Sequence, residues 1–102
     1  MVDTVRAKLV TVIAPAEFQD RLGEALVRLG SGGYTAWLAD GRGQSGKRLR
    51  AFFQISNIRM ETIVSQEQAE AILAHMAAEA EQIHVVAFSQ DVEAVPRKHF
   101  VR

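Results

Sequence analysis

The chain has 102 residues, of which 48% are apolar, so it is long enough for one domain with a hydrophobic core. The absence of cysteine excludes disulfides, thiolate metal sites and a cysteine nucleophile, and no apolar run is long enough to cross a bilayer, so we expect a cytoplasmic protein. Lys and Arg together number 12, as do Asp and Glu, and this balance argues against general nucleic-acid binding, which needs an excess of positive charge.

The first part of the chain predicts a strand, a helix and a second strand. Residues 7–14 (AKLVTVIA) are apolar and β-branched, which is typical of a buried strand, and Pro15 ends it. Between residues 16 and 29 the apolar side chains recur at helical spacing, and the glycine-rich run at residues 30–33 ends that helix. Residues 34–39 (YTAWLA) predict the second strand.

The second part repeats the strand and helix pattern. Residues 58–64 (IRMETIV) predict a third strand, and Ser65 with Gln68 fits the capping box of a helix that follows. Residues 83–88 (IHVVAF) predict a fourth strand, with an irregular tail over residues 91–102. The order β-α-β-β-α-β predicts one α+β domain over residues 1–102, a ferredoxin-like fold with an antiparallel four-stranded sheet and two helices on one face.

The segment between the second and third predicted strands, residues 40–57, is the most unusual part of the sequence. Roughly 18 residues stand where a short hairpin turn would suffice, and loops of that length are usually functional or disordered. Its glycines would let backbone N–H groups approach a phosphate, and its four bases would supply charge (Arg42, Lys47, Arg48, Arg50). The spacing is not that of a Walker motif, and the same composition fits a solvated hairpin tip, so both interpretations stay open.

A second group of bases lies near the C-terminus, at Arg97, Lys98 and Arg102. These residues fit either a frayed basic tail or a second phosphate clamp that reaches a neighbouring subunit. Together with the bases of residues 40–57 they form two local positive patches on an otherwise acidic chain. Such patches favour a small anionic ligand.

Candidate catalytic groups are scattered along the sequence. His75, His84 and His99 lie far apart, without the paired spacing of a metal site, and no serine has the context of a nucleophile elbow. No pairing of an acid with a base, or of a nucleophile with a base, is visible. We therefore predict a binding module and not an enzyme.

Several short motifs in order resemble those of the PII and PII-like signalling proteins over nearly the whole chain. They are Ile13-Ala14-Pro15, Glu24-Ala25-Leu26, Gly33-Tyr34-Thr35 and Gly41-x-Gly43. The long segment at residues 40–57, which begins with the last of these motifs, corresponds to the family's T-loop. Within the family, Gly33-Tyr34-Thr35, Gly41-Arg42-Gly43 and His99-Phe100 are similar to the carboxysome-associated and bicarbonate-transporter-associated branch.

The resemblance implies a homotrimer with an adenine nucleotide in the clefts between subunits. Carried over by position, the adenine contact falls on Thr35 and the phosphate contacts fall on Gly41 and Gly43. Gln44 stands where classical PII proteins have an arginine, so either Arg42 or the group Lys47, Arg48 and Arg50 would supply the missing charge. Arg97 and Lys98 could take the place of the family's C-terminal arginine pair. The family's glycine- and lysine-rich phosphate loop is absent, since residues 80–83 read AEQI, and its loss favours AMP or ADP over ATP.

The same resemblance implies a role in inorganic-carbon metabolism. Bicarbonate is a second expected ligand, held by backbone N–H groups and an arginine in the same polar region. The segment at residues 40–57 would signal to a protein target, either a transporter or a carboxysome component. We expect no nucleic-acid partner, no metal site and no other cofactor.

Three other functions share this topology. A metal-binding trimer similar to the copper-tolerance proteins is the main alternative. The lack of cysteine and of paired histidines in this chain weakens it. An RNA binder would need aromatic side chains on its central strands, and residues 7–14 have none. An acylphosphatase-like enzyme would need an arginine-bearing anion loop after the first strand, where the sequence reads Ala14-Pro15-Ala16.

Overall fold

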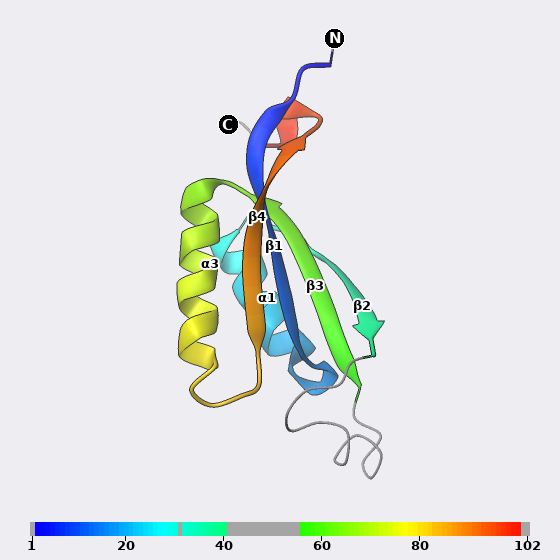
Figure 1. The fold of residues 1–102 in the computed structure, drawn as a ribbon, viewed down its shortest axis with the longest axis vertical. Helices are drawn as coiled ribbons and strands as arrows, with labels where there is room; N and C mark the ends of the chain where they lie inside the picture. Colours follow the sequence, from blue (N-terminus) through cyan, green and yellow to red (C-terminus); the bar gives the residue numbers. More distant parts are fainter. Residues whose placement is uncertain (1, 31, 41–55, 101–102) are drawn as a thin grey trace.

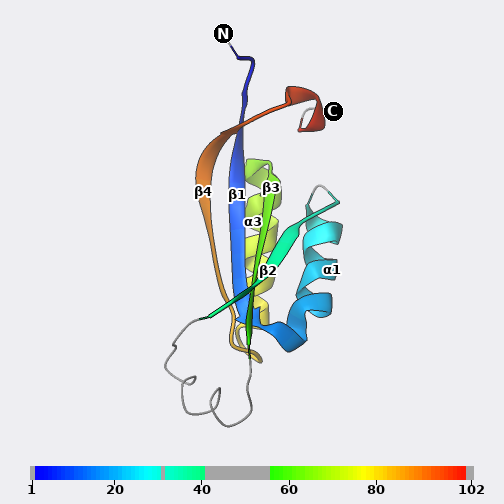
Figure 2. The ribbon, with the colours of Figure 1, turned by 90° about the vertical axis from the view of Figure 1, so that its right-hand side faces the viewer.

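The computed structural model describes residues 2–30, 32–40 and 56–100. Within them, four antiparallel strands form one sheet in the order β2-β3-β1-β4, and the two α-helices cover one of its faces (Figures 1 and 2). The elements in chain order are β1 (Val5–Pro15), the 3₁₀ turn η1 (Ala16–Phe18), α1 (Gln19–Leu29), β2 (Thr35–Ala39), β3 (Asn57–Val64), α3 (Gln66–Glu79), β4 (Val86–Ala94) and the 3₁₀ turn η2 (Arg97–His99). The predicted ferredoxin-like α+β fold is confirmed.

The core lies between the sheet and the helices. Alternate residues of β1 and β3 point toward the helices, because successive side chains of a strand face opposite sides. The helices meet them with the apolar side of each turn. The fully or almost fully buried apolar side chains of this layer include Val10, Val12, Met60, Val64, Leu22, Leu26, Ile72 and Met76.

Local signals account for where α3 begins. The Ser65 hydroxyl accepts a hydrogen bond from the backbone N–H of Gln68 at 3.1 Å, and the Gln68 side chain accepts one from the Ser65 backbone N–H at 2.9 Å. These two bonds make the capping box predicted from the sequence, and they satisfy donors that the first turn leaves without partners.

The start of α1 and the end of α3 are joined by an ion pair. The Arg21 guanidinium donates through Nε to Glu79 Oε2 at 2.9 Å and through Nη2 to Glu79 Oε1. The hydrogen bond from Arg21 lowers the pKa of the Glu79 carboxyl below its usual range, and His75 Nε2, 3.6 Å from Glu79 Oε2, acts in the same direction. The pair therefore links the two helices most strongly while Glu79 is ionised.

The last strand was predicted in the wrong place. It was expected at residues 83–88 with an irregular tail from residue 91, but β4 spans Val86–Ala94 and η2 follows at Arg97–His99. The reason is pairing with β1, which extends to Val5 and lies opposite β4 as far as Ala94. Asp91 and Glu93 look like tail residues in the sequence, yet they stand opposite Lys8 and Arg6 on β1.

Smaller differences concern other boundaries. The helix predicted from residue 16 opens with the 3₁₀ turn η1, and its α-helical part begins at Gln19. Asn57, expected in the long connecting segment, pairs with Pro15 and Ala39 as the first residue of β3. Residues 41–55 of that segment lie outside the described part of the chain.

Candidate functional site

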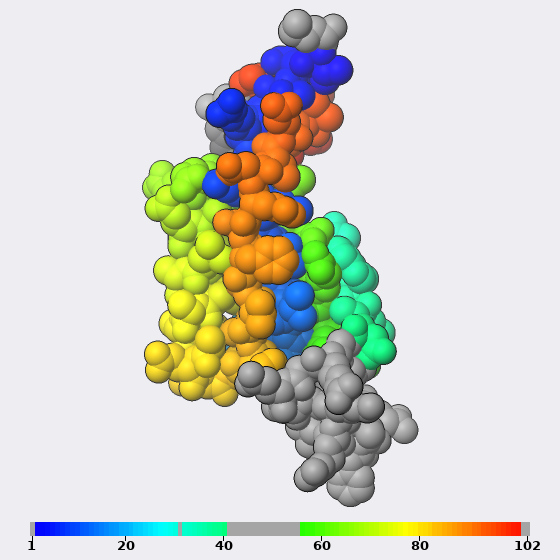
Figure 3. Space-filling view, in the orientation of Figure 1, coloured from blue at the N-terminus to red at the C-terminus, as the bar shows by residue number. Residues whose placement is uncertain are grey.

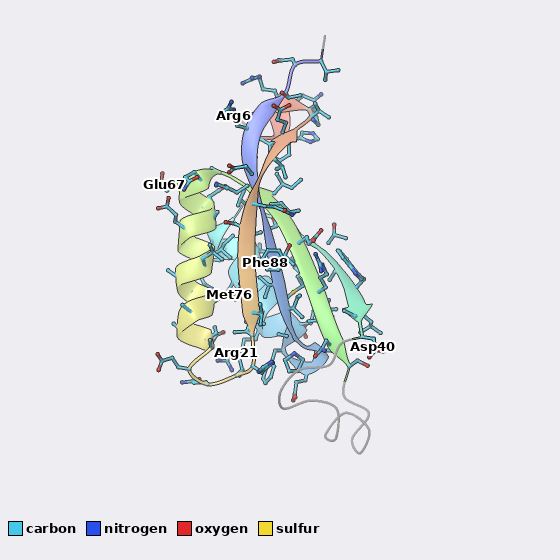
Figure 4. The ribbon with its side chains drawn as sticks, in the orientation of Figure 1. Arg6, Arg21, Asp40, Glu67, Met76 and Phe88 are labelled. Carbon is cyan, nitrogen blue, oxygen red and sulfur yellow. The ribbon has the colours of Figure 1, made fainter. Side chains whose placement is uncertain are left out.

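The face of the sheet that no described helix covers carries a mixture of apolar and charged side chains. Figure 3 shows the four strands side by side on this face, and Figure 4 shows Phe88 of β4 near its middle. Trp37, Val86 and Phe88 keep 43%, 51% and 40% of their surfaces exposed here. We call this surface the open face, made by the residues of β1–β4 that point away from α1 and α3.

A groove lies where the open face meets the C-terminal turn. It holds about 620 Å³, with the start of β2 and the end of β3 on one side and the end of η2 on the other. In Figure 2 this turn lies above the start of β2. The groove is lined by the apolar side chains of Leu9, Trp37, Ile63 and Phe100, by the polar side chains of Thr35, Glu61, Thr62 and His99, and by Gly33 and Tyr34.

The segment Gly33-Tyr34-Thr35 is fixed by contacts with β3 and α1. The Thr62 hydroxyl donates to the Gly33 carbonyl oxygen at 2.8 Å. Tyr34 packs over Gly23 of α1, where a Cβ atom would lie only 2.7 Å from the Tyr34 ring carbon Cζ. Because Tyr34 is turned toward the helix, the next side chain, Thr35, lies on the open face, opposite Glu61.

Charges on the open face are paired next to the groove. Glu61 Oε2 accepts hydrogen bonds from Thr11 Oγ1 and from Arg59 Nη2, each at 3.1 Å. The Arg59 guanidinium lies 5.9 Å from the centre of the Trp37 ring, a distance at which a cation and an aromatic ring attract each other. These contacts hold Glu61 and Trp37 in place, so this part of the groove is preorganised.

The model of the nitrogen regulatory protein P-II family matches residues 7–99. The chain belongs to the P-II family. A PII-like signalling protein of Thermus thermophilus is 37% identical over 98% of this chain and 100% of its own, with a TM-score of 0.81. No curated protein sequence matches the chain.

Solved structures of CPII, a nitrogen regulatory PII-like protein of Thiomonas intermedia, have the same fold. The form bound to ADP and bicarbonate is 19% identical, covers 98% of this chain and 99% of its own, and has a TM-score of 0.83. The form bound to ADP, AMP and bicarbonate is 20% identical, with coverages of 92% and 98% and a TM-score of 0.76. Together with the family match, these likenesses confirm the resemblance drawn from the sequence.

Of the predicted P-II contacts that the structure describes, only Thr35 lines the groove. Arg97 and Lys98 are exposed and do not line this groove. Asp40, which follows β2, lies at the opposite end of the molecule from Arg6 and the C-terminal turn (Figure 4). The remaining predicted contacts, Gly41, Arg42, Gly43, Gln44, Lys47 and Arg48, lie outside the described residues.

Sequence reasoning missed most of the groove. Leu9, Trp37, Glu61 and Ile63 occupy alternate strand positions, so a period of two would have assigned them to one face, but which face stays open depends on where the helices pack. Phe100 and His99 were noted only for their likeness to a family branch. Their place in the groove depends on the fold of η2.

The described residues hold neither a cluster of metal ligands nor a membrane-spanning helix. Within residues 2–30, 32–40 and 56–100, no three His, Asp or Glu side chains lie close enough together to hold a metal ion. Among the same residues, neither helix has the length and apolar character needed to cross a bilayer.

Proposed function

We propose that this P-II protein is a regulatory sensor that binds an adenine nucleotide, AMP or ADP, with the base in the groove at Thr35. The observation that carries the proposal is the groove itself. Its volume of about 620 Å³ is in the usual range for small-molecule sites, and it combines apolar walls with a few polar groups. A purine ring has the same combination of flat apolar faces and a polar edge.

The geometry suggests how such a ligand would lie. Leu9, Ile63 and Phe100 would cover the faces of the base, and the Thr35 hydroxyl would bond to its polar edge. From Thr35, β2 runs toward Asp40. The strand ends at Ala39, and its four steps of about 3.3 Å each together come close to the length of an extended nucleotide. Phosphates that follow β2 would point toward the next segment, which holds the other proposed contacts, namely Gly41, Arg42, Gly43, Gln44, Lys47 and Arg48.

The open face supports a homotrimeric assembly. A cluster of exposed large apolar side chains (Trp37, Val86, Phe88) on one sheet face is unusual for a monomer and favours association with another chain. In a trimer the groove would border a neighbouring subunit. Arg97 and Lys98 lie at the base end of the groove in their own chain, so a phosphate contact from them would have to be made to a neighbour's nucleotide.

The signalling part of the proposal rests on the family and the sequence. A nucleotide whose phosphates contact residues 40–57 would favour one state of that segment by its differential contacts, and so present or withdraw a surface for a protein target, either a transporter or a carboxysome component. Bicarbonate is the proposed second ligand, since CPII of Thiomonas intermedia is bound to bicarbonate together with ADP. The protein would then act in inorganic-carbon metabolism without catalysing a reaction, in the cytoplasm.

Fluorescence of the single tryptophan, Trp37, tests the proposal directly because this side chain lines the groove. Titration with AMP, ADP and ATP, with and without bicarbonate, should change the Trp37 signal with saturation at one nucleotide per chain. Thr35→Ala should weaken binding about tenfold, roughly the loss of one hydrogen bond to a buried polar group. Arg42→Ala should weaken AMP and ADP binding, and the nucleotides should be recovered unchanged.

Val27→Ala is a suitable control, since Val27 is exposed on α1 and does not line the groove. It should bind nucleotides like the wild-type protein. If no adenine nucleotide produces a saturable change in fluorescence or in calorimetric heat, the proposed function is wrong. Binding that is indifferent to bicarbonate would remove the second ligand alone.

A further inference from the structure

The C-terminal turn is attached to the N-terminal end of the chain through one side chain. The Arg97 guanidinium donates through Nε to the two carboxylate oxygens of Asp3, at 3.1 and 3.2 Å, and through Nη2 to the Thr4 carbonyl oxygen at 2.6 Å. These partners directly precede β1 and lie 93 and 94 residues away in the sequence. We call this set of contacts the Arg97 latch.

Residues 96–100 form a short, internally bonded unit. The His99 N–H donates to the Pro96 carbonyl and the Phe100 N–H donates to the Arg97 carbonyl, both at 3.0 Å. The His99 and Phe100 rings meet edge to face, with their centres 6.4 Å apart. Because the turn is closed by its own hydrogen bonds, anchoring Arg97 also fixes where His99 and Phe100 lie.

Those two residues form the wall of the groove opposite Thr35, and the latch itself lies outside the groove. The Arg97 guanidinium already has a carboxylate and a carbonyl as partners, so a phosphate would compete with Asp3 for its positive charge. Two accounts of Arg97 are therefore distinct. In one it contacts phosphate, and in the other it holds the wall that contacts the base.

We propose that Arg97 is a positioning residue, whose latch to Asp3 and Thr4 holds Phe100 and His99 as the base-binding wall of the groove. The inference rests on the proposed function for its ligand, a purine nucleoside or nucleotide. It assigns to Asp3 a role in binding that a phosphate clamp would not give it. On this account Asp3 acts only through Arg97, so removing Asp3 should add nothing once Arg97 has been removed.

The experiment compares AMP with adenosine, which lacks a phosphate, in the wild-type protein and in Asp3→Ala, Arg97→Ala, Phe100→Ala and the Asp3→Ala/Arg97→Ala double variant. If the latch positions the wall, both ligands should bind about two- to fivefold more weakly in each latch variant, the modest loss expected for an exposed ion pair. The double variant should match Arg97→Ala, and Asp3→Glu should restore most of the affinity lost in Asp3→Ala. Arg28→Ala, a change at an exposed arginine on α1, should have no effect.

A second readout needs no ligand. Trp37 shares the groove with Phe100, so loosening the wall should expose its ring further and shift its emission to longer wavelength in the free protein. Asp3→Ala and Arg97→Ala should give the shift seen in Phe100→Ala. Failure of the wild-type protein to bind AMP would remove the proposed function, whereas this shift would still support the latch.

Three results would overturn the inference. Asp3→Ala could bind AMP as well as or better than the wild-type protein, as expected if Asp3 competes with phosphate for Arg97. Arg97→Ala could weaken AMP binding and leave adenosine binding unchanged, which would make Arg97 a phosphate contact. Finally, Trp37 emission could shift in Phe100→Ala and stay unchanged in both latch variants.

Discussion

The two faces of the sheet are made by alternate residues of the same strands, yet their surroundings differ. On the covered face, Val10, Val12 and Met60 are buried under α1 and α3. On the open face, Trp37 and Phe88 stay partly exposed beside the paired charges of Arg59 and Glu61. The covered face therefore supplies stability within one chain, and the open face is the surface that we propose for a ligand and for further chains.

The contrast teaches that burial within one chain and suitability for an interface are separate properties of a strand. Met60 and Glu61 are neighbours in β3, but the first fills the core while the second accepts hydrogen bonds from Thr11 and Arg59 next to the groove. A substitution on the covered face, as at Met60, should change the stability of the fold. A substitution on the open face, as at Glu61, should change association or binding. This difference can be tested by paired variants.

The largest expected effect is on the covered face. Met60→Ala removes a fully buried side chain that the helices cannot replace, so the free energy of unfolding should fall by about 2–5 kcal/mol. Val86→Ala on the open face, where about half of the residue is exposed, should lower the free energy of unfolding much less. Urea denaturation of both variants measures the difference. Equal losses would contradict the division between the faces.

An intermediate effect is expected for assembly. Phe88→Asp puts a charge in the middle of the open face and should shift the protein from the proposed trimer to monomer, since a buried unpaired charge strongly disfavours an interface. Val27→Asp is the matched control, because Val27 on α1 is 45% exposed against 40% for Phe88. Analytical ultracentrifugation of both variants reports the mass. A trimer that survives Phe88→Asp would exclude the open face as its interface.

The smallest effect concerns the helices that make the covered face. The hydrogen bond from Arg21 lowers the pKa of Glu79, so the contact stabilises the folded state above the usual Glu pKa and is lost as the pH falls through the lowered value. Glu79→Gln should lower Tm at neutral pH by roughly 2–5 °C and should reduce the further loss in acid. Thermal melts over a pH series measure both quantities.

Glu24→Gln serves as the control for the acid series, since Glu24 is an exposed carboxylate on the same helix as Arg21. Its melting curves should follow those of the wild-type protein at every pH. If the difference in Tm between Glu79→Gln and the wild-type protein is the same in acid as at neutral pH, the contact between Arg21 and Glu79 does not depend on the ionisation of Glu79.

The sequence by itself determined the features that depend on neighbouring residues. The strand and helix order followed from periodicity, and the start of α3 followed from Ser65 and Gln68, which bond to each other within one turn. The motif Gly33-Tyr34-Thr35 identified one side of the candidate site, because Thr35 was assigned from a family motif of three consecutive residues. None of these depends on where distant segments pack.

The tertiary structure alone decided the features that join distant segments. β4 runs to Ala94 because Asp91 and Glu93 face Lys8 and Arg6 across the sheet, and no local pattern marks those residues as a strand. The partners of Arg97 come from the other end of the chain, at Asp3 and Thr4. An ion pair or a groove wall of this kind depends on which ends of the sheet meet, and that is set by the packing of the whole domain and not by the order of residues nearby.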